Sequence, residues 1–181
     1  MQNVLDIKRN KLTIIDLLQS TNRKGIENVL QYLEDSGFYV VPSSKHRHHN
    51  WKGGLAQHCL GVYRNALLLA GDSYSKDSVA IVALLHDVCK ASKLYYDNEG
   101  RIHHRHTHIH GHGYRSVKLL QLLKLELSHE ERNAIRWHMG GHHASAEQLN
   151  SVNEARKSLL WQVIHKADKM DAAANGVNKI N

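Results

Sequence analysis

The sequence SVAIVALLHDVCKA at residues 78–91 joins an apolar run to a polar pair. The seven residues from Val79 to Leu85 are apolar around the whole circumference of a helix, which is typical of a helix buried in a core. His86 and Asp87 follow at the buried end of this helix. A buried polar group without a partner costs on the order of 1–3 kcal/mol, and a buried charge costs more. A shared cation would satisfy both side chains, so this stretch predicts a helical core that carries a metal ion.

Helical spacing extends over most of the chain, which contains a single proline. Gly53 and Gly54 open one predicted helix. His58 shares the apolar face of this helix with Leu55 and Val62, so its ring is predicted to point inward. Other predicted features are a helix face formed by Leu12, Ile15 and Leu18, an N-cap at Asn22, a helix start at Asp77 or Ser78, a capping box of Ser128 with Glu131, and a last helix from about Glu154.

These elements predict an all-α fold. A chain of 181 residues is long enough for one substantial core and short for two. No segment alternates convincingly with the period of two that indicates a strand. Residues 92–113 are polar and rich in histidine, and we expect them to form a loop.

The composition limits the class of protein. The longest apolar run is far below the roughly 20 residues that cross a bilayer. The N-terminal MQNVLDIKRN carries charges where a signal peptide needs apolar residues, so we expect a cytoplasmic protein without a membrane partner. The net charge of +7 suits anionic partners, but no block of basic residues indicates a nucleic-acid arm. Cys59 and Cys89 are expected to be reduced core thiols.

Histidine is the compositional anomaly, with 16 residues. Imidazole is the commonest metal ligand in proteins, so this count directs attention to metal chemistry. Several histidines lie between His103 and His110. For this segment we expect a solvated loop, with adventitious metal binding and a place at the entrance of a site as alternatives. A metal-buffering protein is therefore one functional hypothesis.

Asp168 lies next to the inward face that Leu160, Ile164 and Ala167 form on the last predicted helix. Together with His58, His86 and Asp87, it could form a six-coordinate site completed by water. The alternatives without a metal are a core histidine bonded to a backbone carbonyl, a polar pair at a helix end and a solvated carboxylate. Mixed nitrogen and oxygen ligands suit Mn²⁺, Fe²⁺, Ni²⁺, Zn²⁺ or Mg²⁺ and do not choose among them.

Five motifs follow one another in the order GGLAQH, ALLHDVCK, HGHGYRSV, IRWHMG and HKADK. From about His48 to Met170 this series resembles the HD domain of metal-dependent phosphohydrolases. HHNWKGGLAQH is similar to the start of the HD domain in certain bacterial 3′→5′ exoribonucleases. GHGxxSVxLLQ with IRWHMG is similar to small stand-alone bacterial and phage HD proteins. The resemblance implies that residues 48–181 form an HD-domain helical bundle and that residues 1–47 form a short N-terminal helical leader packed on it. It also implies one divalent ion held by His58, His86, Asp87 and Asp168.

The same resemblance implies roles for further residues, and it assigns catalytic roles to Asp87, Lys90, His112 and His138. Lys90 takes the place of the lysine in the HDxxK form, which binds the substrate phosphate. His112 and His138 match positions that hold a second ion in two-metal HD enzymes and line the phosphate pocket in one-metal relatives; both alternatives stay open.

Substrate binding is expected of Lys90, Arg115 and His49. Tyr114 and Arg115 stand where the family has an acidic-basic pair after GHG, so pocket specificity stays open.

The resemblance implies a hydrolase of ester bonds in which metal-activated water attacks a phosphate ester, first of all a nucleotide monoester. The alternative substrate is a phosphodiester: a cyclic nucleotide, a dinucleoside polyphosphate or an RNA 3′ end. A small-molecule substrate is favoured over nucleic acid because no β-rich nucleic-acid module accompanies the helices. The rival function is a non-catalytic HD protein that senses a nucleotide. The oligomeric state does not follow from the sequence.

Overall fold

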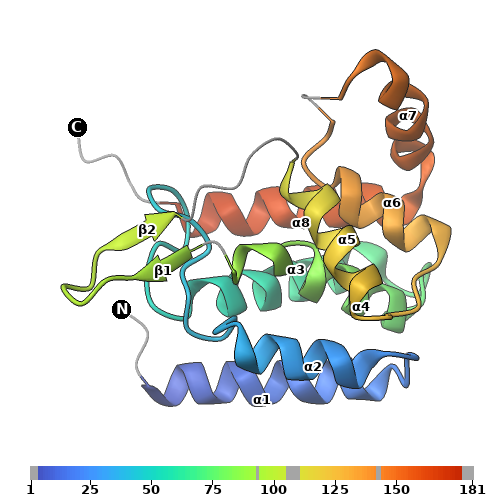
Figure 1. Cartoon of the computed structure of the whole chain (residues 1–181). Helices are drawn as coiled ribbons and strands as arrows, with labels where there is room; N and C mark the ends of the chain where they lie inside the picture. The colour runs from blue at the N-terminus through green and yellow to red at the C-terminus, as the bar shows by residue number, and fades with distance from the viewer. Residues whose placement is uncertain (1–3, 93, 105–110, 142–143, 177–181) are drawn as a thin grey trace.

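The computed structural model describes residues 4–92, 94–104, 111–141 and 144–176. Within these ranges, the chain forms eight α-helices and a small hairpin (Figure 1). The helices are α1 (Val4–Ser20), α2 (Ile26–Asp35), α3 (Gly54–Ala70), α4 (Lys76–Leu85), α5 (His112–Leu122), α6 (His129–Trp137), α7 (Leu149–Lys157) and α8 (Leu159–Ala174). The short elements are the 3₁₀ turns η1 (Val88–Lys90) and η2 (Ala146–Gln148) and the strands β1 (Leu94–Tyr96) and β2 (Ile102–His104). The predicted all-α class is confirmed.

Helix α3 packs against both α4 and α8. As the apolar run predicts, every residue from Val79 to Leu85 is at most 3% exposed. Full burial of one large aliphatic side chain stabilises the fold by about 1.5–3 kcal/mol, so α4 is a main contributor to the core. Helix α6 packs against α4, α5 and α8. Helix α4 also contacts α1 and α8, so helices from both earlier and later parts of the chain surround it.

The N-terminal helices form a layer along one side of the bundle (Figure 1). Helix α1 packs against α3 and α4. In the α1–α2 connection, Arg23 donates hydrogen bonds of 2.7 and 2.9 Å to the two carboxylate oxygens of Glu131 on α6. Ser78 and the backbone N–H of Ser128 donate to the same carboxylate. This buried, fully paired carboxylate ties residues 1–47 to the bundle, while the division of the chain between residues 47 and 48 stays a prediction.

Several predicted helix ends need correction. The capping box of Ser128 with Glu131 is confirmed. The N-cap of α2 is Gly25 in the left-handed conformation, not Asn22, and the N-cap of α4 is Ser75, whose side chain accepts a bond from the Ser78 N–H. The predicted last helix is two helices, because Ser158 adopts an extended conformation and caps α8.

The buried face of α1 also differs from the prediction. Leu12 is 51% exposed, whereas Ile14 and Leu18 are fully buried. These two residues are four positions apart, so they lie one above the other on the same side of a helix. The predicted face used a spacing of three residues from Leu12, which does not follow the buried side of the helix.

The hairpin corrects the prediction that residues 92–113 are a loop throughout. Strands β1 and β2 are antiparallel, with Leu94 opposite His104 and Tyr96 opposite Ile102. Asp97 holds the turn because its Oδ1 atom accepts hydrogen bonds from the backbone N–H groups of Glu99 and Arg101. Strands of three residues are too short to display a period of two. Of the predicted histidine segment, residues 105–110 lie outside the described residues.

No described helix combines the length and the apolar character needed to span a membrane.

Candidate metal centre

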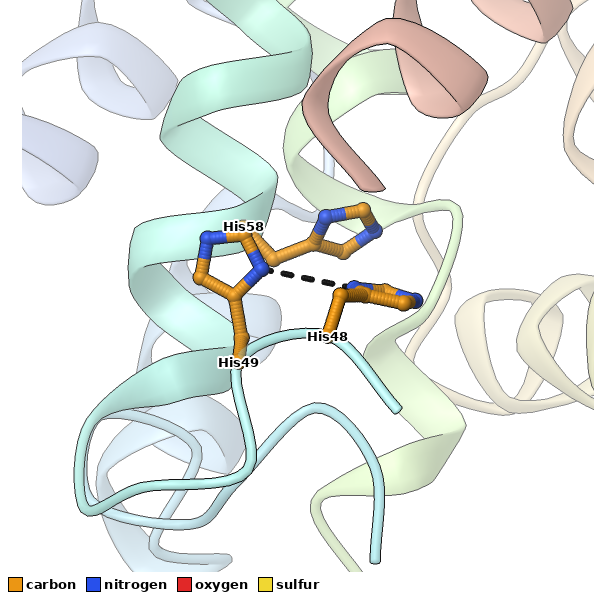
Figure 2. A group of neighbouring side chains, drawn as sticks. All are labelled: His48, His49 and His58. Carbon is orange, nitrogen blue, oxygen red and sulfur yellow. Dashed lines mark hydrogen bonds between the residues drawn. The ribbon is translucent and has the colours of Figure 1, made fainter. Parts of the chain in front are cut away.

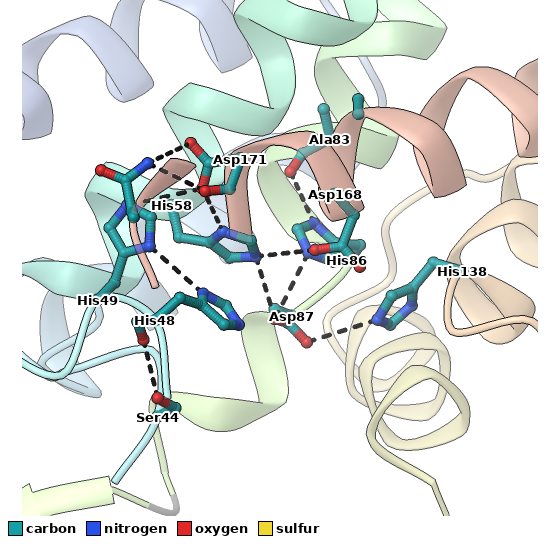
Figure 3. A network of polar contacts seen from close by, with 12 residues as sticks. Ser44, His48, His49, His58, Ala83, His86, Asp87, His138, Asp168 and Asp171 are labelled. Carbon is teal, nitrogen blue, oxygen red and sulfur yellow. Dashed lines mark hydrogen bonds and ion pairs between the residues drawn. The ribbon is translucent and has the colours of Figure 1, made fainter. Parts of the chain in front are cut away.

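The structure brings His58, His86, Asp87 and Asp168 together from α3, the end of α4 and α8 (Figure 3). All four are buried, with relative exposures of 0, 0, 1 and 8%. The Nε2 atom of His58 lies 3.2 Å from Oδ1 of Asp168 and 3.7 Å from Oδ2 of Asp87. The Nε2 atom of His86 lies 3.4 Å from the same Asp87 oxygen. Four potential ligands therefore converge on one point, as the sequence predicts.

The other ring nitrogen of each histidine determines the tautomer. Nδ1 of His86 lies 2.8 Å from the carbonyl oxygen of Ala83, and Nδ1 of His138 lies 2.7 Å from that of Ile135. A carbonyl oxygen can only accept, so both Nδ1 atoms carry the proton. Nδ1 of His58 donates in the same way to a carboxylate, that of Asp171. Each ring in its neutral form therefore directs the lone pair of Nε2 at the centre, which is the arrangement of metal-ligating histidines.

These inward-facing atoms have no hydrogen-bond partner among the described residues. The set comprises Nε2 of His58, His86, His112 and His138 and Oδ1 of Asp87. Two groups of three side chains keep their ligand atoms within 4.8 Å of one another. The first is His58, His86 and Asp168, and the second is His86, Asp87 and His138. A divalent cation would satisfy the ligand atoms of either group, whereas a buried polar atom left unpaired costs on the order of 1–3 kcal/mol. The residues present thus fit a metal ion.

The two carboxylates supply the charge that such an ion requires. Burial raises the pKa of Asp87, but the positive charge of Lys90 and the rings of His86 and His112 outweigh burial and hold that pKa well below its ordinary value. Burial likewise raises the pKa of Asp168, and His58 and His86 reverse the effect. Both groups are therefore anionic at neutral pH.

The neighbouring carboxylates also change the pKa of His58. Burial lowers the pKa of His58, but its contacts with Asp168 and Asp171 outweigh burial and raise that pKa to about 9. The carboxylates thus attract positive charge to the Nε2 atom of this ring. A bound metal ion would compete with a proton for that position, since a histidine ligand must be neutral.

A second group surrounds the other oxygen of Asp87. The Nε2 atoms of His112 and His138 lie 3.6 and 3.7 Å from Oδ1 of Asp87. Burial, followed by the neighbouring ring of His86, lowers the pKa of His138 to about 3, so this imidazole is neutral with a free lone pair. Gly113 permits the approach of α5 to α6, because a Cβ atom there would lie 2.4 Å from the carbonyl oxygen of Arg136.

Lys90 lies beside this centre on η1, so its side chain reaches Asp87 from a 3₁₀ turn and not from a continuation of α4. Its Nζ atom is 2.5 Å from Oδ2 of Asp87. Burial lowers the pKa of Lys90, but the charge of Asp87 reverses this and raises it, so the ammonium group stays charged.

Asp171 is a site residue that the sequence analysis missed. Its Oδ2 atom accepts the Nδ1–H bond of His58 at 2.7 Å. Asp171 lies three residues after Asp168 and so on the same side of α8, which is the signal that would have found it. Gly61 leaves room for this side chain, because a Cβ atom at residue 61 would lie 1.9 Å from Oδ1 of Asp171.

His49, for which substrate binding is expected, lies behind the cavity lining. Its side chain is fully buried and is not among the residues that line the cavity described below. Its Nε2 atom instead lies 3.6 Å from the Asp171 carboxylate. His48 lines the cavity, and its ring centroid is 4.6 Å from that of His58 (Figure 2). The backbone here is tight: a Cβ atom on Gly54 would lie 2.1 Å from the carbonyl oxygen of His49.

A cavity of about 830 Å³ opens onto the centre. Asp87 and Asp168 are the acidic residues in its lining, and Lys90, His112 and His138 line it as well. The other lining residues with permanent positive charge are Lys45, Arg47, Arg115 and Lys169. The predicted metal ligands thus face a basic cavity large enough for a small molecule.

A model of the HD domain matches residues 55–173. The chain therefore belongs to the HD domain family. It is also similar to the dihydroneopterin 2′,3′-cyclic phosphate phosphodiesterase of Methanocaldococcus jannaschii, with 27% identity over 152 residues that make up 79% of this chain. The chain spans only 57% of the length of that relative. No solved structure matches the chain significantly.

Proposed function

We propose that the protein is a metal-dependent phosphohydrolase that acts on a small nucleotide-like phosphate ester. One observation carries this proposal. Histidine Nε2 atoms without partners in the described part of the chain and two ionised carboxylates converge beside a basic cavity. Membership of the HD domain family and the similarity to a cyclic phosphate phosphodiesterase support it.

His58, His86, Asp87 and Asp168 would hold the ion, which when bound lowers the pKa of a water molecule and polarises a phosphoryl oxygen. Asp87 would orient the attacking water, and the position of its two oxygens, which face the two groups of histidines, supports this role. Lys90 supplies a fixed positive charge 2.5 Å from Asp87 and would bind the phosphate. His112 and His138 would either stabilise charge on the phosphoryl oxygens or hold a second ion.

Two substrate classes remain as candidates. A nucleotide monoester is the first, since an open metal site with a lysine and two histidines can bind a dianionic phosphate. A cyclic phosphodiester is the second, and the named activity of the relative favours it. Arg115 lines the cavity and is a candidate for contacts outside the reacting phosphate.

The test uses the full chain loaded with Mn²⁺, with the metal content determined by elemental analysis. Turnover is measured on adenosine 3′-monophosphate, on adenosine 2′,3′-cyclic phosphate and on bis(p-nitrophenyl) phosphate. We expect hydrolysis of at least one ester, and the preferred ester assigns the class. Asp87→Asn is the control for a contaminating phosphatase. A protein that holds metal and binds nucleotide without turnover on any ester would contradict the proposal and support the nucleotide-sensing function.

A further inference from the structure

We propose that Ser43, Lys45, Arg47 and Lys169 form a distal subsite that binds a second phosphate group of the substrate. The inference rests on the proposed function and narrows its substrate class to nucleotides that carry a phosphate besides the one that reacts. All four residues line the cavity of about 830 Å³ that opens onto the metal centre.

Ser43 provides the first observation. This residue is 1% exposed, and its hydroxyl oxygen has no hydrogen-bond partner among the described residues. A buried hydroxyl without a partner costs on the order of 1–3 kcal/mol. Since Ser43 lines the cavity, a phosphate oxygen bound there could accept the missing hydrogen bond.

The charges provide a second, independent observation. In the described ranges, no carboxylate lies within ion-pair distance of Lys45, Arg47 or Lys169. The ion pairs that other lysine and arginine side chains form in these ranges do not include these three residues. The two carboxylates in the lining are those of the metal centre. The two charges of a divalent ion would offset these two carboxylates, which leaves the lining with the positive charges of Lys90, Arg115, Lys45, Arg47 and Lys169. A phosphate monoester carries about −1.5 to −2 charges at neutral pH, so one such group offsets only part of them. The remaining positive charge suits a second phosphate.

The loop that carries three of these residues is held in shape by its own hydrogen bonds. The Ser44 hydroxyl donates to the carbonyl oxygen of His48 and accepts from the backbone N–H of Arg47. The backbone N–H of Ser43 donates to the carbonyl oxygen of His49 at 3.0 Å. A loop closed in this way loses little conformational freedom when it binds a ligand.

The same loop adjoins the metal centre. The ring of His48, at the end of the loop, lies 4.6 Å from that of His58 between centroids and is tilted by 54° to it (Figure 2). A cavity of 830 Å³ lies in the upper part of the roughly 300–1,000 Å³ range of small-molecule sites. One phosphoryl group would fill only part of it. A nucleotide with one phosphate at the metal and another at the loop would use both ends.

The experiment compares adenosine 3′,5′-bisphosphate with adenosine 3′-monophosphate and adenosine 5′-monophosphate on the Mn²⁺-loaded full chain, by calorimetric titration. We expect the bisphosphate to bind at least about tenfold more tightly than either monophosphate, since each charge-assisted contact is worth a comparable factor. The double variant Lys45→Ala with Arg47→Ala should remove this advantage. Its affinity for the more tightly bound monophosphate should stay within about twofold of the wild-type value.

The matched control is Lys52→Ala with Lys76→Ala, which removes the same charge from two exposed positions outside the cavity lining. This variant should keep the preference for the bisphosphate. Ser43→Ala should weaken the bisphosphate several-fold and leave the monophosphates unchanged. If Ser43 has no ligand, its replacement would instead leave all three affinities unchanged.

The subsite would be overturned if the wild type bound the bisphosphate and the better monophosphate with equal affinity. It would also be overturned if the loop variant and the control variant lost the same affinity for all three ligands. These outcomes differ from a failure of the proposed function. Hydrolysis without a preference for the bisphosphate removes the subsite alone, whereas a preference in binding without any hydrolysis removes the catalytic function alone.

Discussion

The Nδ1 atom of His58 lies 2.7 Å from the Oδ2 atom of Asp171, which is 113 residues further along the chain. This contact directs the Nε2 lone pair of His58 toward Asp87 and Asp168 (Figure 3). A carboxylate behind a histidine fixes the ring orientation and raises its strength as a metal ligand. This contact predicts that Asp171 is a positioning residue for the candidate metal centre.

Asp171→Asn should lower Mn²⁺ affinity by about 10–100-fold, the usual effect of losing such a partner. The measurement is calorimetric titration of the metal-free protein, with circular dichroism as a check on the fold. Asp72→Asn changes an exposed carboxylate to the same amide and should leave metal affinity unchanged. Equal affinity in Asp171→Asn and wild type would remove the positioning role.

Asp87→Asn should abolish hydrolysis and weaken metal binding while the helices stay folded. The change is nearly isosteric, but it removes the anion that faces both groups of histidines. Turnover, bound metal and the helical circular dichroism signal are measured on the same preparation. Activity equal to that of the wild type would mean that the chemistry lies elsewhere.

Lys90→Ala should separate catalysis from metal binding. Lys90 contributes no candidate ligand atom, so the metal content should persist. Catalysis should fall by roughly 2–4 kcal/mol of transition-state stabilisation, the scale of losing one preorganised donor. The kcat and KM values measured beside elemental analysis test this prediction. Loss of metal together with activity would assign Lys90 a role in holding the site together.

His138→Ala tests for a second ion. His112 and His138 both face Oδ1 of Asp87, while His58 and His86 face Oδ2. We expect anaerobic titration with Mn²⁺ to saturate at two equivalents in the wild type and at one in the variant. Saturation at one equivalent in both proteins would contradict the second ion and would favour a role of His138 in binding the phosphate.

Glu131→Gln should destabilise the fold by about 2–4 kcal/mol at pH 7, because Arg23 loses its buried ionic partner. Burial raises the pKa of Glu131, but Arg23 and Ser128 outweigh burial and lower it. The contribution of this carboxylate is therefore fully present above the unfolded pKa, near 4.5, and is lost as pH falls through the lower folded value.

Urea denaturation of wild type and Glu131→Gln at several pH values checks this prediction. The difference in unfolding free energy should shrink as the pH falls below about 4.5. Glu147→Gln, at an exposed position, should leave stability unchanged at every pH. A difference that stays constant with pH would contradict the ionic account.

Local patterns in the sequence were sufficient to predict the buried helix, one helix cap and the four candidate metal ligands. The apolar run from Val79 to Leu85 predicts a buried helix, because every side of such a helix is apolar and none is suited to face water. The capping box of Ser128 and Glu131 depends on neighbours three residues apart and is likewise local. The order of the histidine and aspartate motifs resembles the HD domain, and it anticipated the four side chains that meet at the centre. These signals arise within a few residues, or within a known series of motifs.

Tertiary structure alone decided which neighbours complete the site. Whether His48 or His49 faces the cavity depends on the left-handed backbone of His49, with φ of 50°, and on its close approach to Gly54. The partnership of Asp171 with His58 depends on how α8 packs on α3, and the hairpin depends on pairing between two three-residue strands. Contacts between segments distant in sequence carry no local periodicity or cap. The packed bundle specifies them because only there are the two surfaces brought within bonding distance.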